Sequence, residues 1–305
     1  MPAPSAIETF DAALPHGITL SCRATGAIDA PLVIFLHGFP EAAFAWDEML
    51  LAFGGRYRCV APNLRGFERS SAPVEVEAYR AKHLVADIAA LAAHCNLAAG
   101  RAPDAAMHAL VAHDWGGAVA WALAAQRGAL LGRLAIVNSP HPATFLRELQ
   151  QSPAQQAASA YMNFLCRDDA AQRLAADDFA LMWRFFAADG AAWFTDAVKA
   201  QYRAVWSAGL QGGLNYYRAS PLRPPPDGDD RALKALAFAP EAVTVQVPTL
   251  VLWGEGDIAL LPSLLDGLEA FVPRLRVVRV PGATHWIVHE QPALVEREIG
   301  AFLAT

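Results

Sequence analysis

The residue of this chain best placed to do chemistry is Asp114, which lies in the stretch Ala-Leu-Val-Ala-His-Asp-Trp-Gly-Gly at residues 109–117. An apolar run ends just before this residue, and a segment of helical composition follows it. Small residues two places to either side, Ala112 and Gly116, leave room for a sharp strand–turn–helix junction. The layout predicts a nucleophile elbow with Asp114 at its centre. The simpler alternative is that Asp114 only caps the helix.

An aspartate at this position indicates a different reaction from that of the serine often found in such elbows. A carboxylate is ionised at neutral pH, so it attacks without a base to activate it. Attack on a saturated carbon, such as that of an epoxide or a carbon–halogen bond, gives an alkyl ester of the enzyme. Water activated by a base can then cleave this ester. We therefore expect a two-step displacement with Asp114 as the nucleophile.

Two further residues that follow predicted strands would complete this catalytic set. His285, in Val-Pro-Gly-Ala-Thr-His-Trp, is placed to take a proton from the hydrolytic water. Asp257, in Leu-Trp-Gly-Glu-Gly-Asp, is predicted to orient the imidazole, with Glu255 as its nearest competitor and a simple turn acid as the alternative. His289 lies four residues after His285, but no third ligand of suitable spacing is evident, so we expect no metal.

Donors are needed for the negative charge that develops in both steps. The turn His37-Gly38-Phe39-Pro40 and the start of the helix after the elbow predict an oxyanion hole from the backbone N–H groups of Phe39 and Trp115. An ordinary Gly-Pro turn is the alternative, and the bond before Pro40 is one that can be cis.

Two tyrosines are predicted to act on the oxygen released when an epoxide opens. Tyr161 and Tyr217 lie in the region between the two halves of the predicted core, and a phenol is protonated at neutral pH but more acidic than an alcohol. Core packing is the alternative for each, and Tyr216 is a rival for the role of Tyr217.

Composition excludes several classes of function. With 305 residues, of which 54% are hydrophobic and 18% charged, the chain can bury a large core. A net charge of −6 without a basic stripe argues against nucleic acid or membrane partners. The N-terminus lacks the pattern of a signal peptide, and no apolar run has membrane-spanning length. We expect a cytoplasmic monomer or homodimer without a cofactor. The scattered cysteines are expected to be buried thiols: Cys22, Cys59, Cys95 and Cys166.

Short apolar runs that alternate with helical segments predict an α/β fold with a mostly parallel sheet. The predicted strands are 32–37, 58–62, 107–113, 134–138, 249–253 and 275–280. The predicted helices include 42–53, 79–94, 117–126 and 294–303. Active-site residues of such sheets lie at the carboxyl ends of the strands, where the residues above are found.

The alternation stops after Pro142, and a stretch of helical periodicity follows until the Pro-rich linker 221–228. We expect a helical cap, residues 141–223, inserted into a core made of residues 1–140 and 224–305. One apolar stripe of this cap has helical spacing and is expected to pack inside it or to line a pocket: Phe179, Met182, Trp183 and Phe186.

Together these motifs resemble the epoxide hydrolases of the α/β-hydrolase superfamily. The resemblance rests on the stretches His37-Gly-Phe-Pro, His113-Asp-Trp-Gly-Gly, Gly-Gly-Leu-Asn-Tyr-Tyr-Arg ending at Arg218, Trp253-Gly-Glu-Gly-Asp and Gly282-Ala-Thr-His-Trp. It implies an apolar epoxide and water as substrates, a vicinal diol as product, and the roles given above for Asp114, His285, Asp257, Tyr161 and Tyr217. We also expect substrate contacts from His37, Pro40, His113 and Trp183.

A haloalkane dehalogenase is the alternative enzyme, because Asp-Trp elbows occur in both groups. Dehalogenases that resemble this chain usually carry Asn or Glu at the position of Phe39, and the paired tyrosines also argue against them. Trp115 would suit halide binding, and Trp183, Trp193 or Trp206 would have to supply the second halide donor. A hydrolase-like protein that only binds its ligand is the remaining alternative.

Overall fold

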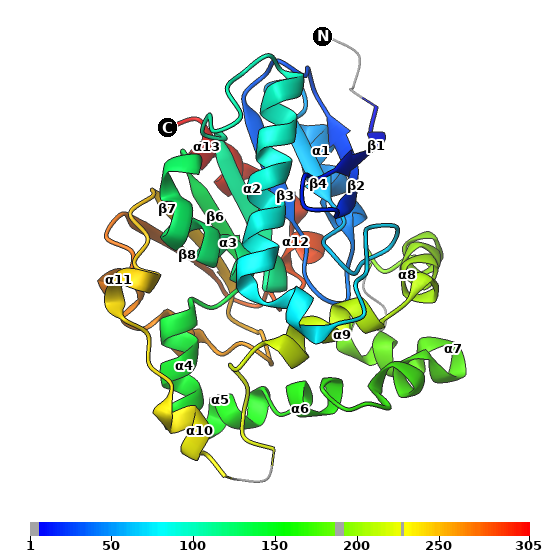
Figure 1. Cartoon of the computed structure of the whole chain (residues 1–305). Coiled ribbons are helices and arrows are strands. Elements are labelled where there is room, and N and C mark those ends of the chain that lie inside the picture. Colours follow the sequence, from blue (N-terminus) through cyan, green and yellow to red (C-terminus); the bar gives the residue numbers. More distant parts are fainter. Residues whose placement is uncertain (1–5, 187–191, 227–228) are drawn as a thin grey trace.

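One sheet of eight strands runs through the middle of the molecule (Figure 1). The computed structural model describes residues 6–186, 192–226 and 229–305. The strands are β1 (Glu8–Ala13), β2 (Thr19–Thr25), β3 (Leu32–Leu36), β4 (Arg58–Pro62), β5 (Ala109–His113), β6 (Leu134–Val137), β7 (Thr249–Gly254) and β8 (Leu275–Val280). Their spatial order is β1-β2-β4-β3-β5-β6-β7-β8. The pairs β1·β2 and β2·β4 are antiparallel, and the other pairs are parallel.

The central strands form because their residues are apolar on both faces. All residues of β3, Leu-Val-Ile-Phe-Leu, are buried, and so are all residues of β5, β6 and β7. Successive side chains enter opposite layers: Val33 and Phe35 belong to one core cluster, and Ile34 and Leu36 to the other. The predicted mostly parallel α/β sheet is therefore confirmed.

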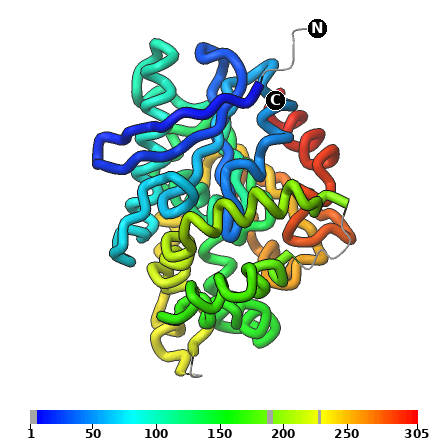
Figure 2. The backbone as a smooth tube through the Cα atoms, turned by 90° about the vertical axis from the view of Figure 1, so that its right-hand side faces the viewer, coloured from blue at the N-terminus to red at the C-terminus, as the bar shows by residue number. Residues whose placement is uncertain are grey.

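Strands β1 and β2 have no counterpart among the strands predicted from the sequence. The residues of β1, Glu-Thr-Phe-Asp-Ala-Ala, are mostly exposed and mix polar with apolar types, because this strand lies at the edge of the sheet. The hairpin of β1 and β2 projects along the outside of the molecule (Figure 2). An antiparallel edge strand needs only one apolar face, so it lacks the continuous apolar run of the central strands.

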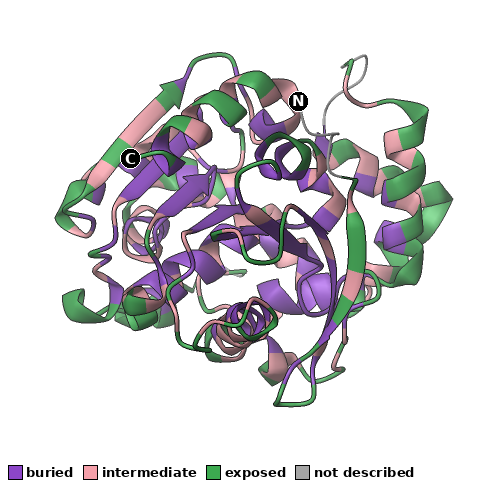
Figure 3. Cartoon of the chain, turned by 90° about the horizontal axis from the view of Figure 1, so that it is seen from above, coloured by how far each residue is buried: buried purple, intermediate pink, exposed green. Residues whose placement is uncertain are grey.

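Helices cover both faces of the sheet. Their bounds are α1 (Asp47–Phe53), α2 (Ala81–Ala98), α3 (Asp114–Arg127), α4 (Pro142–Gln151), α5 (Pro153–Ala158), α6 (Tyr161–Leu165), α7 (Ala170–Phe186), α8 (Asp196–Ala208), α9 (Gln211–Ala219), α10 (Arg231–Ala235), α11 (Pro240–Val243), α12 (Ile287–Glu290) and α13 (Pro292–Leu303), with short 3-10 helices η1 (Ala43–Trp46), η2 (Val76–Tyr79), η3 (Gly128–Leu130), η4 (Pro262–Leu265) and η5 (Leu268–Ala270). Helices α1, α12 and α13 share the core cluster of Phe35, whereas α2 and α3 share that of Ile34. The sheet is accordingly buried between two layers (Figure 3).

Helices α4 to α9 lie between β6 and β7 in the chain and form the inserted helical segment, residues 142–219. Figures 1 and 2 both place its first helices beyond one end of the sheet. In its predicted apolar stripe, Met182 and Phe186 are buried, Trp183 is half-buried, and Phe179 lies at a kink of α7. Residues 177–179 have φ between 51° and 61°, so two helical stretches meet there. The linker that follows ends at residues 227–228, which lie outside the described residues, as do residues 1–5 of the N-terminus.

The cysteines are free thiols, of which Cys22, Cys59 and Cys95 are buried, as predicted. Cys166 departs from the prediction because it is only half-buried. No helix within the described ranges is both long and apolar enough to cross a lipid bilayer.

Candidate active site

Asp114 stands at a strained junction between β5 and α3. Its φ of 48° lies in the left-handed region, which costs a non-glycine residue about 1–2 kcal/mol. The turn can be this sharp because Gly116 touches the neighbouring strand: a Cβ on Gly116 would lie 2.5 Å from the carbonyl oxygen of His37. The first position before the helix belongs to His113, and the Asp114 carboxylate turns away from the helix instead of capping it.

The Asp114 carboxylate is held through one of its two oxygens. The backbone N–H of Phe39 donates to Oδ1 over 2.8 Å. Gly38 makes this approach possible, because a Cβ there would lie 2.3 Å from the same oxygen. Oδ2 lies 3.8 Å from Nε2 of His285, and 14% of the Asp114 side chain is exposed. Oδ1 is therefore fixed by the backbone, while Oδ2 is the oxygen left to react.

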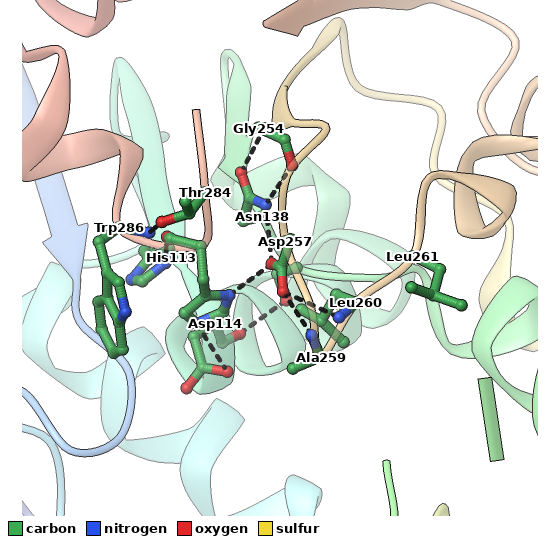
Figure 4. Close-up of polar contacts among 12 residues, drawn as sticks. His113, Asp114, Asn138, Gly254, Asp257, Ala259, Leu260, Leu261, Thr284 and Trp286 are labelled. Carbon is green, nitrogen blue, oxygen red and sulfur yellow. Dashed lines mark hydrogen bonds and ion pairs between the residues drawn. The ribbon is translucent and has the colours of Figure 1, made fainter. Parts of the chain in front are cut away.

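His285 and Asp257 form a hydrogen-bonded pair beside Asp114. Nδ1 of His285 lies 2.6 Å from Oδ2 of Asp257, whose side chain is fully buried. The other oxygen of Asp257 accepts from the backbone N–H groups of Ala259 and Leu260, each over 2.9 Å. Figure 4 shows Asp257 between these donors and Asn138, whose amide donates to Oδ2 over 2.9 Å. The carboxylate thus has one fixed orientation toward the imidazole.

Glu255, the competitor for the role of Asp257, faces elsewhere. Its carboxylate lies 3.5 Å from the guanidinium of Arg279 on β8. The chain turns between Glu255 and Asp257, so the Asp257 carboxylate points toward His285. The loop after β7 therefore brings only one of its two acids to His285.

Charge around His285 changes how readily it binds a proton. Burial lowers the pKa of His285, but the charge and hydrogen bond of Asp257 raise it, and Asp114 and Glu41 add to this, so that the pKa reaches about 9. Burial also raises the pKa of Asp257, yet the His285 charge and the hydrogen bonds to this carboxylate outweigh burial and lower it overall. Asp257 is therefore ionised, and His285 holds its proton more tightly than an ordinary histidine.

Tyr161 on α6 and Tyr217 on α9 meet above Asp114. Their ring centroids lie 6.2 Å apart, and the ring of Tyr217 also packs edge-on against that of Trp115 at 5.0 Å. Burial raises the pKa of both phenols, and the charge of Asp114 raises both further. Both hydroxyls are therefore close to the carboxylate and protonated at neutral pH, which makes them available as donors.

Tyr216 points away from this pair. Its hydroxyl donates to the backbone carbonyl of Arg65 over 3.0 Å, and its side chain is 1% exposed. Successive residues of a helix differ in direction by about 100°, so only one of two neighbouring tyrosines can face Asp114. In this structure that residue is Tyr217.

A cavity of about 450 Å³ opens onto these groups. Asp114, Trp115, Tyr161 and Tyr217 line it at one end, and most of its remaining wall is apolar. The volume falls in the range of small-molecule sites, and an apolar wall with a few convergent polar groups is typical of them.

The other predicted contact residues do not line this cavity. His37 is fully buried: Nε2 accepts from the Leu64 N–H, and Nδ1 lies 2.9 Å from the carbonyl oxygen of Gly38, so the ring braces the turn. Pro40 follows a cis peptide bond, and its carbonyl accepts from the indole N–H of Trp206. The predicted substrate contacts of His37 and Pro40 are absent from the cavity lining, because both residues hold the backbone of the turn beside the site instead.

His113 and Trp183 are likewise placed outside the cavity lining. His113 is buried, with Nε2 3.0 Å from the carbonyl oxygen of His285 and Nδ1 3.1 Å from Glu41. Trp183 donates its indole N–H to the carbonyl of Asp178 and stacks under the guanidinium of Arg203. His113 therefore supports the loop of His285 from behind, and Trp183 packs against Arg203 and Trp206 of α8.

Glu41, which lies directly after the Phe39–Pro40 turn, is absent from the site residues predicted from the sequence. This buried carboxylate accepts from the Tyr202 hydroxyl over 2.8 Å and lies 2.6 Å from Nε2 of His289. Burial raises the pKa of Glu41, but the charge of His289 and the hydrogen bonds of the two histidines lower it well below its usual range. Glu41 thus joins the oxyanion turn, the elbow and the His285 loop, and His289 is bound to it instead of forming a metal pair with His285.

Asn138 and Ser139, at the end of β6, are also absent from the predicted set. Asn138 has a φ of 36° and ties Asp257 to the N–H of Gly254, which donates to its side-chain oxygen over 2.8 Å. The Ser139 hydroxyl donates to the backbone carbonyl of Asp114 over 2.6 Å. Polar residues at the end of a buried strand are a signal that the sequence does carry.

Across the described ranges, no group of three or more histidine, cysteine or acidic side chains is arranged to hold a metal ion.

Comparisons with known proteins identify chains of similar sequence and fold. The family model described as the alpha/beta hydrolase fold matches residues 31–292. The AB hydrolase superfamily protein YfhM of Bacillus subtilis is 32% identical over 94% of this chain and 95% of its own length. Epoxide hydrolase 3 of Xenopus tropicalis is 31% identical over 94% of this chain and 75% of its own length. The crystal structure of a mutant epoxide hydrolase from Bacillus megaterium matches with a TM-score of 0.87 at 27% identity, covering 97% of this chain and 100% of that one.

Proposed function

Because the chain belongs to the α/β-hydrolase fold family and, within it, to the epoxide hydrolases, we propose that it hydrolyses an apolar epoxide to a vicinal diol through an ester on Asp114. The observation that carries this proposal is the Asp114 carboxylate itself. One of its oxygens is fixed by the Phe39 N–H, and the other lies at the floor of an apolar cavity that two tyrosines line.

In the first step, Oδ2 of Asp114 attacks one ring carbon of the epoxide, and the bond from that carbon to the ring oxygen breaks. The electron pair of this bond stays on the oxygen, which becomes an alkoxide. Tyr161 and Tyr217 donate hydrogen bonds to it and supply a proton. Two charge-assisted hydrogen bonds in a water-poor site are a large stabilisation, because each hydrogen bond to a charged group contributes about 1.5–3 kcal/mol.

In the second step, water attacks the carbonyl carbon of the ester while Nε2 of His285 takes a proton from it. The backbone N–H of Phe39, with that of Trp115 at the start of α3, stabilises the oxyanion that forms on the Asp114 side chain. Cleavage of the bond between this carbon and the alkyl oxygen releases the diol and returns the carboxylate. Asp257 holds the imidazole in the required tautomer and stabilises the imidazolium.

The inserted helical segment would act as the cap of this site. It supplies both tyrosines, which lie on α6 and α9, so closing it over the core would complete the donor set. This corresponds to a division of the chain into a core of residues 1–140 and 224–305 and a cap of residues 141–223.

Haloalkane dehalogenation is supported less well than epoxide hydrolysis. It would need a second indole donor beside Trp115, and none of the three candidates, Trp183, Trp193 and Trp206, is part of the cavity lining. Trp206 donates to the Pro40 carbonyl, Trp183 donates to the Asp178 carbonyl, and Trp193 stacks on His289 with ring centroids 4.6 Å apart. The tyrosine pair suits an alkoxide leaving group, which needs a proton, better than a halide, which does not.

The direct test is to supply the purified protein with an aryl epoxide and, separately, with a chloroalkane, and to measure diol and halide. We expect diol only. A single turnover in ¹⁸O-water should then place the label in the Asp114 side chain, because water attacks the carbonyl carbon of the ester. Label found exclusively in the diol would exclude the covalent route, and halide release without diol would replace epoxide hydrolysis with the alternative.

Asp114→Asn is the matched control for this test. It preserves the shape of the side chain but removes the charge that attacks, so both the diol and the label in residue 114 should be lost. Diol formation at the original rate by this variant would contradict a role for Asp114 as the nucleophile.

A further inference from the structure

From Asp114 the cavity follows helix α3. Half of the residues of this helix are buried, whereas Trp115, Ala118, Ala122 and Ala125 are half-exposed, and each of these four lines the cavity. Their spacing of three, four and three residues places them on one face of the helix. The cavity therefore follows this face as a channel.

The channel is long and open at its far end. Gln126 lines it and is exposed, as is Ala242 across from it on α11. Twelve residues separate Asp114 from Gln126, which corresponds to about 18 Å along the helix axis at ~1.5 Å per residue. An extended chain of roughly fifteen single bonds covers this distance, on the scale of ~3.4 Å for every three backbone bonds.

Apolar side chains form the opposite wall of the channel. Phe145, Met162, Leu222, Phe238 and Val243 lie along it, whereas the polar lining groups gather mainly around Asp114. On the helix side the alanine side chains add little bulk to the channel wall. A substrate arm placed here would exchange water for hydrocarbon contacts over its whole length.

The molecule is closed on the other side of Asp114. The ring of Phe39 packs edge-on against those of Phe185 and Tyr217, with centroid distances of 6.1 Å and 5.5 Å. Behind Phe39 the structure has a space of about 10 Å³, which is about the size of one water molecule. Of the residues that the structure describes, neither Phe39, Phe185 nor His285 is part of the cavity lining.

We propose that the substrate is a terminal epoxide with one long, extended apolar chain, which lies along the Trp115–Ala125 face of α3 while the small end of the epoxide faces Phe39. This rests on the proposed function, since it assumes that the reacting group is an epoxide at Asp114. An epoxide in the middle of a chain would need two long arms, whereas within the described residues the cavity lining follows one direction from the carboxylate, along α3.

The test is a series of unbranched 1,2-epoxyalkanes from about four to about eighteen carbons, with kcat/KM measured by diol formation. We expect kcat/KM to rise about two- to fourfold with each added methylene until the channel is full, and then to level off. An internal epoxide with the same number of carbons as the best terminal one should be at least tenfold poorer.

Two variants locate the chain. Ala122→Leu narrows the channel at about 12 Å from Asp114 and Ala125→Leu at about 16 Å, on the rise of ~1.5 Å per residue. Each should move the levelling-off point to shorter chains, and Ala122→Leu should move it further. Ala98→Leu, at an exposed position of α2 outside the cavity lining, is the control and should leave the series unchanged.

The outcomes separate the two proposals. No diol from any epoxide would remove the proposed function. The channel proposal alone would be overturned if diol formed with a kcat/KM that does not depend on chain length. It would also be overturned if the internal and the terminal epoxide had the same kcat/KM. The channel proposal would likewise be overturned if kcat/KM depended on chain length in the same way for Ala122→Leu and Ala98→Leu. If a leucine variant melts well below the original protein, the wild-type series and the internal epoxide still decide.

Discussion

Neighbouring tyrosines on α9 allow the epoxide-oxygen donors to be tested with a control one residue away. Tyr217 packs against Tyr161 and lines the cavity together with Asp114, whereas the Tyr216 hydroxyl donates to the buried Arg65 carbonyl. Replacing either with phenylalanine removes one hydroxyl from the same helix. Tyr217→Phe should slow the reaction and leave the fold stable, whereas Tyr216→Phe should destabilise the fold and leave the reaction rate nearly unchanged. The reason is that the Tyr217 hydroxyl would donate to the substrate, whereas the Tyr216 hydroxyl donates to a buried backbone carbonyl.

The expected changes in rate and in the free energy of unfolding follow from what each hydroxyl contacts. Tyr217→Phe removes a donor to a developing alkoxide, a hydrogen bond of about 1.5–3 kcal/mol, so ring opening should slow about ten- to hundredfold while Tyr161 remains. Removing both tyrosines should slow it more than about a thousandfold. Tyr216→Phe leaves a buried carbonyl unpaired, so the free energy of unfolding should fall by about 1–3 kcal/mol, with less than about a threefold change in rate.

The assay combines a single-turnover measurement, with enzyme in excess over epoxide, and a denaturant titration of each variant. Single turnover isolates ring opening from product release, and the titration separates lost donors from lost folding. If Tyr217→Phe opened the epoxide at the original rate, or if Tyr216→Phe slowed it equally, the assignment from hydroxyl direction would be refuted.

Further predictions concern the histidine and its surroundings. His285→Gln should let the ester accumulate, and intact-mass analysis should find the protein heavier by one substrate molecule; no adduct would contradict its role as the base. The folded pKa of His285, about 9, lies above the unfolded value of ~6.5, so its contribution of order 3 kcal/mol to unfolding is fully present below pH ~6.5 and is lost as pH rises through about 9. The stability difference between wild type and His285→Gln should shrink across that window, and a constant difference would count against the shift. Glu41→Gln should lower the free energy of unfolding by about 3–5 kcal/mol, because it leaves His289 and His113 beside an uncharged amide; a loss below about 1 kcal/mol would show that this cluster matters little.

The sequence predicts Asp114, Asp257 and His285 because each follows a buried apolar strand. Parallel strands bring their carboxyl ends to one edge of the sheet, so residues far apart in the chain must meet there. Their types then limit the chemistry. The structure brings these three side chains together, with His285 at 2.6 Å from Asp257 and at 3.8 Å from Asp114.

The cluster around Glu41 cannot be predicted in the same way. Glu41, His113 and His289 lie near the same strand ends, but they face behind the site and bind one another. Whether a polar side chain in a turn points into the cavity or braces the turn from below depends on backbone direction within one or two residues. The choice between Tyr216 and Tyr217 is of this kind, and so is the placement of Trp183.

The charges around His285 give the two proposed steps their order. Asp257, Asp114 and Glu41 together raise its pKa to about 9, so before the reaction the imidazole holds a proton and is a poor base. Alkylation of Asp114 turns one of these carboxylates into a neutral ester, 3.8 Å from Nε2 at the start. One of the three charges that favour the protonated form is then lost, so the pKa of His285 falls, while Asp257 and Glu41 continue to raise it. The proton it gives up matches the one that the opened epoxide takes. Ester formation therefore favours the neutral imidazole, which is the form of His285 that can accept a proton from water.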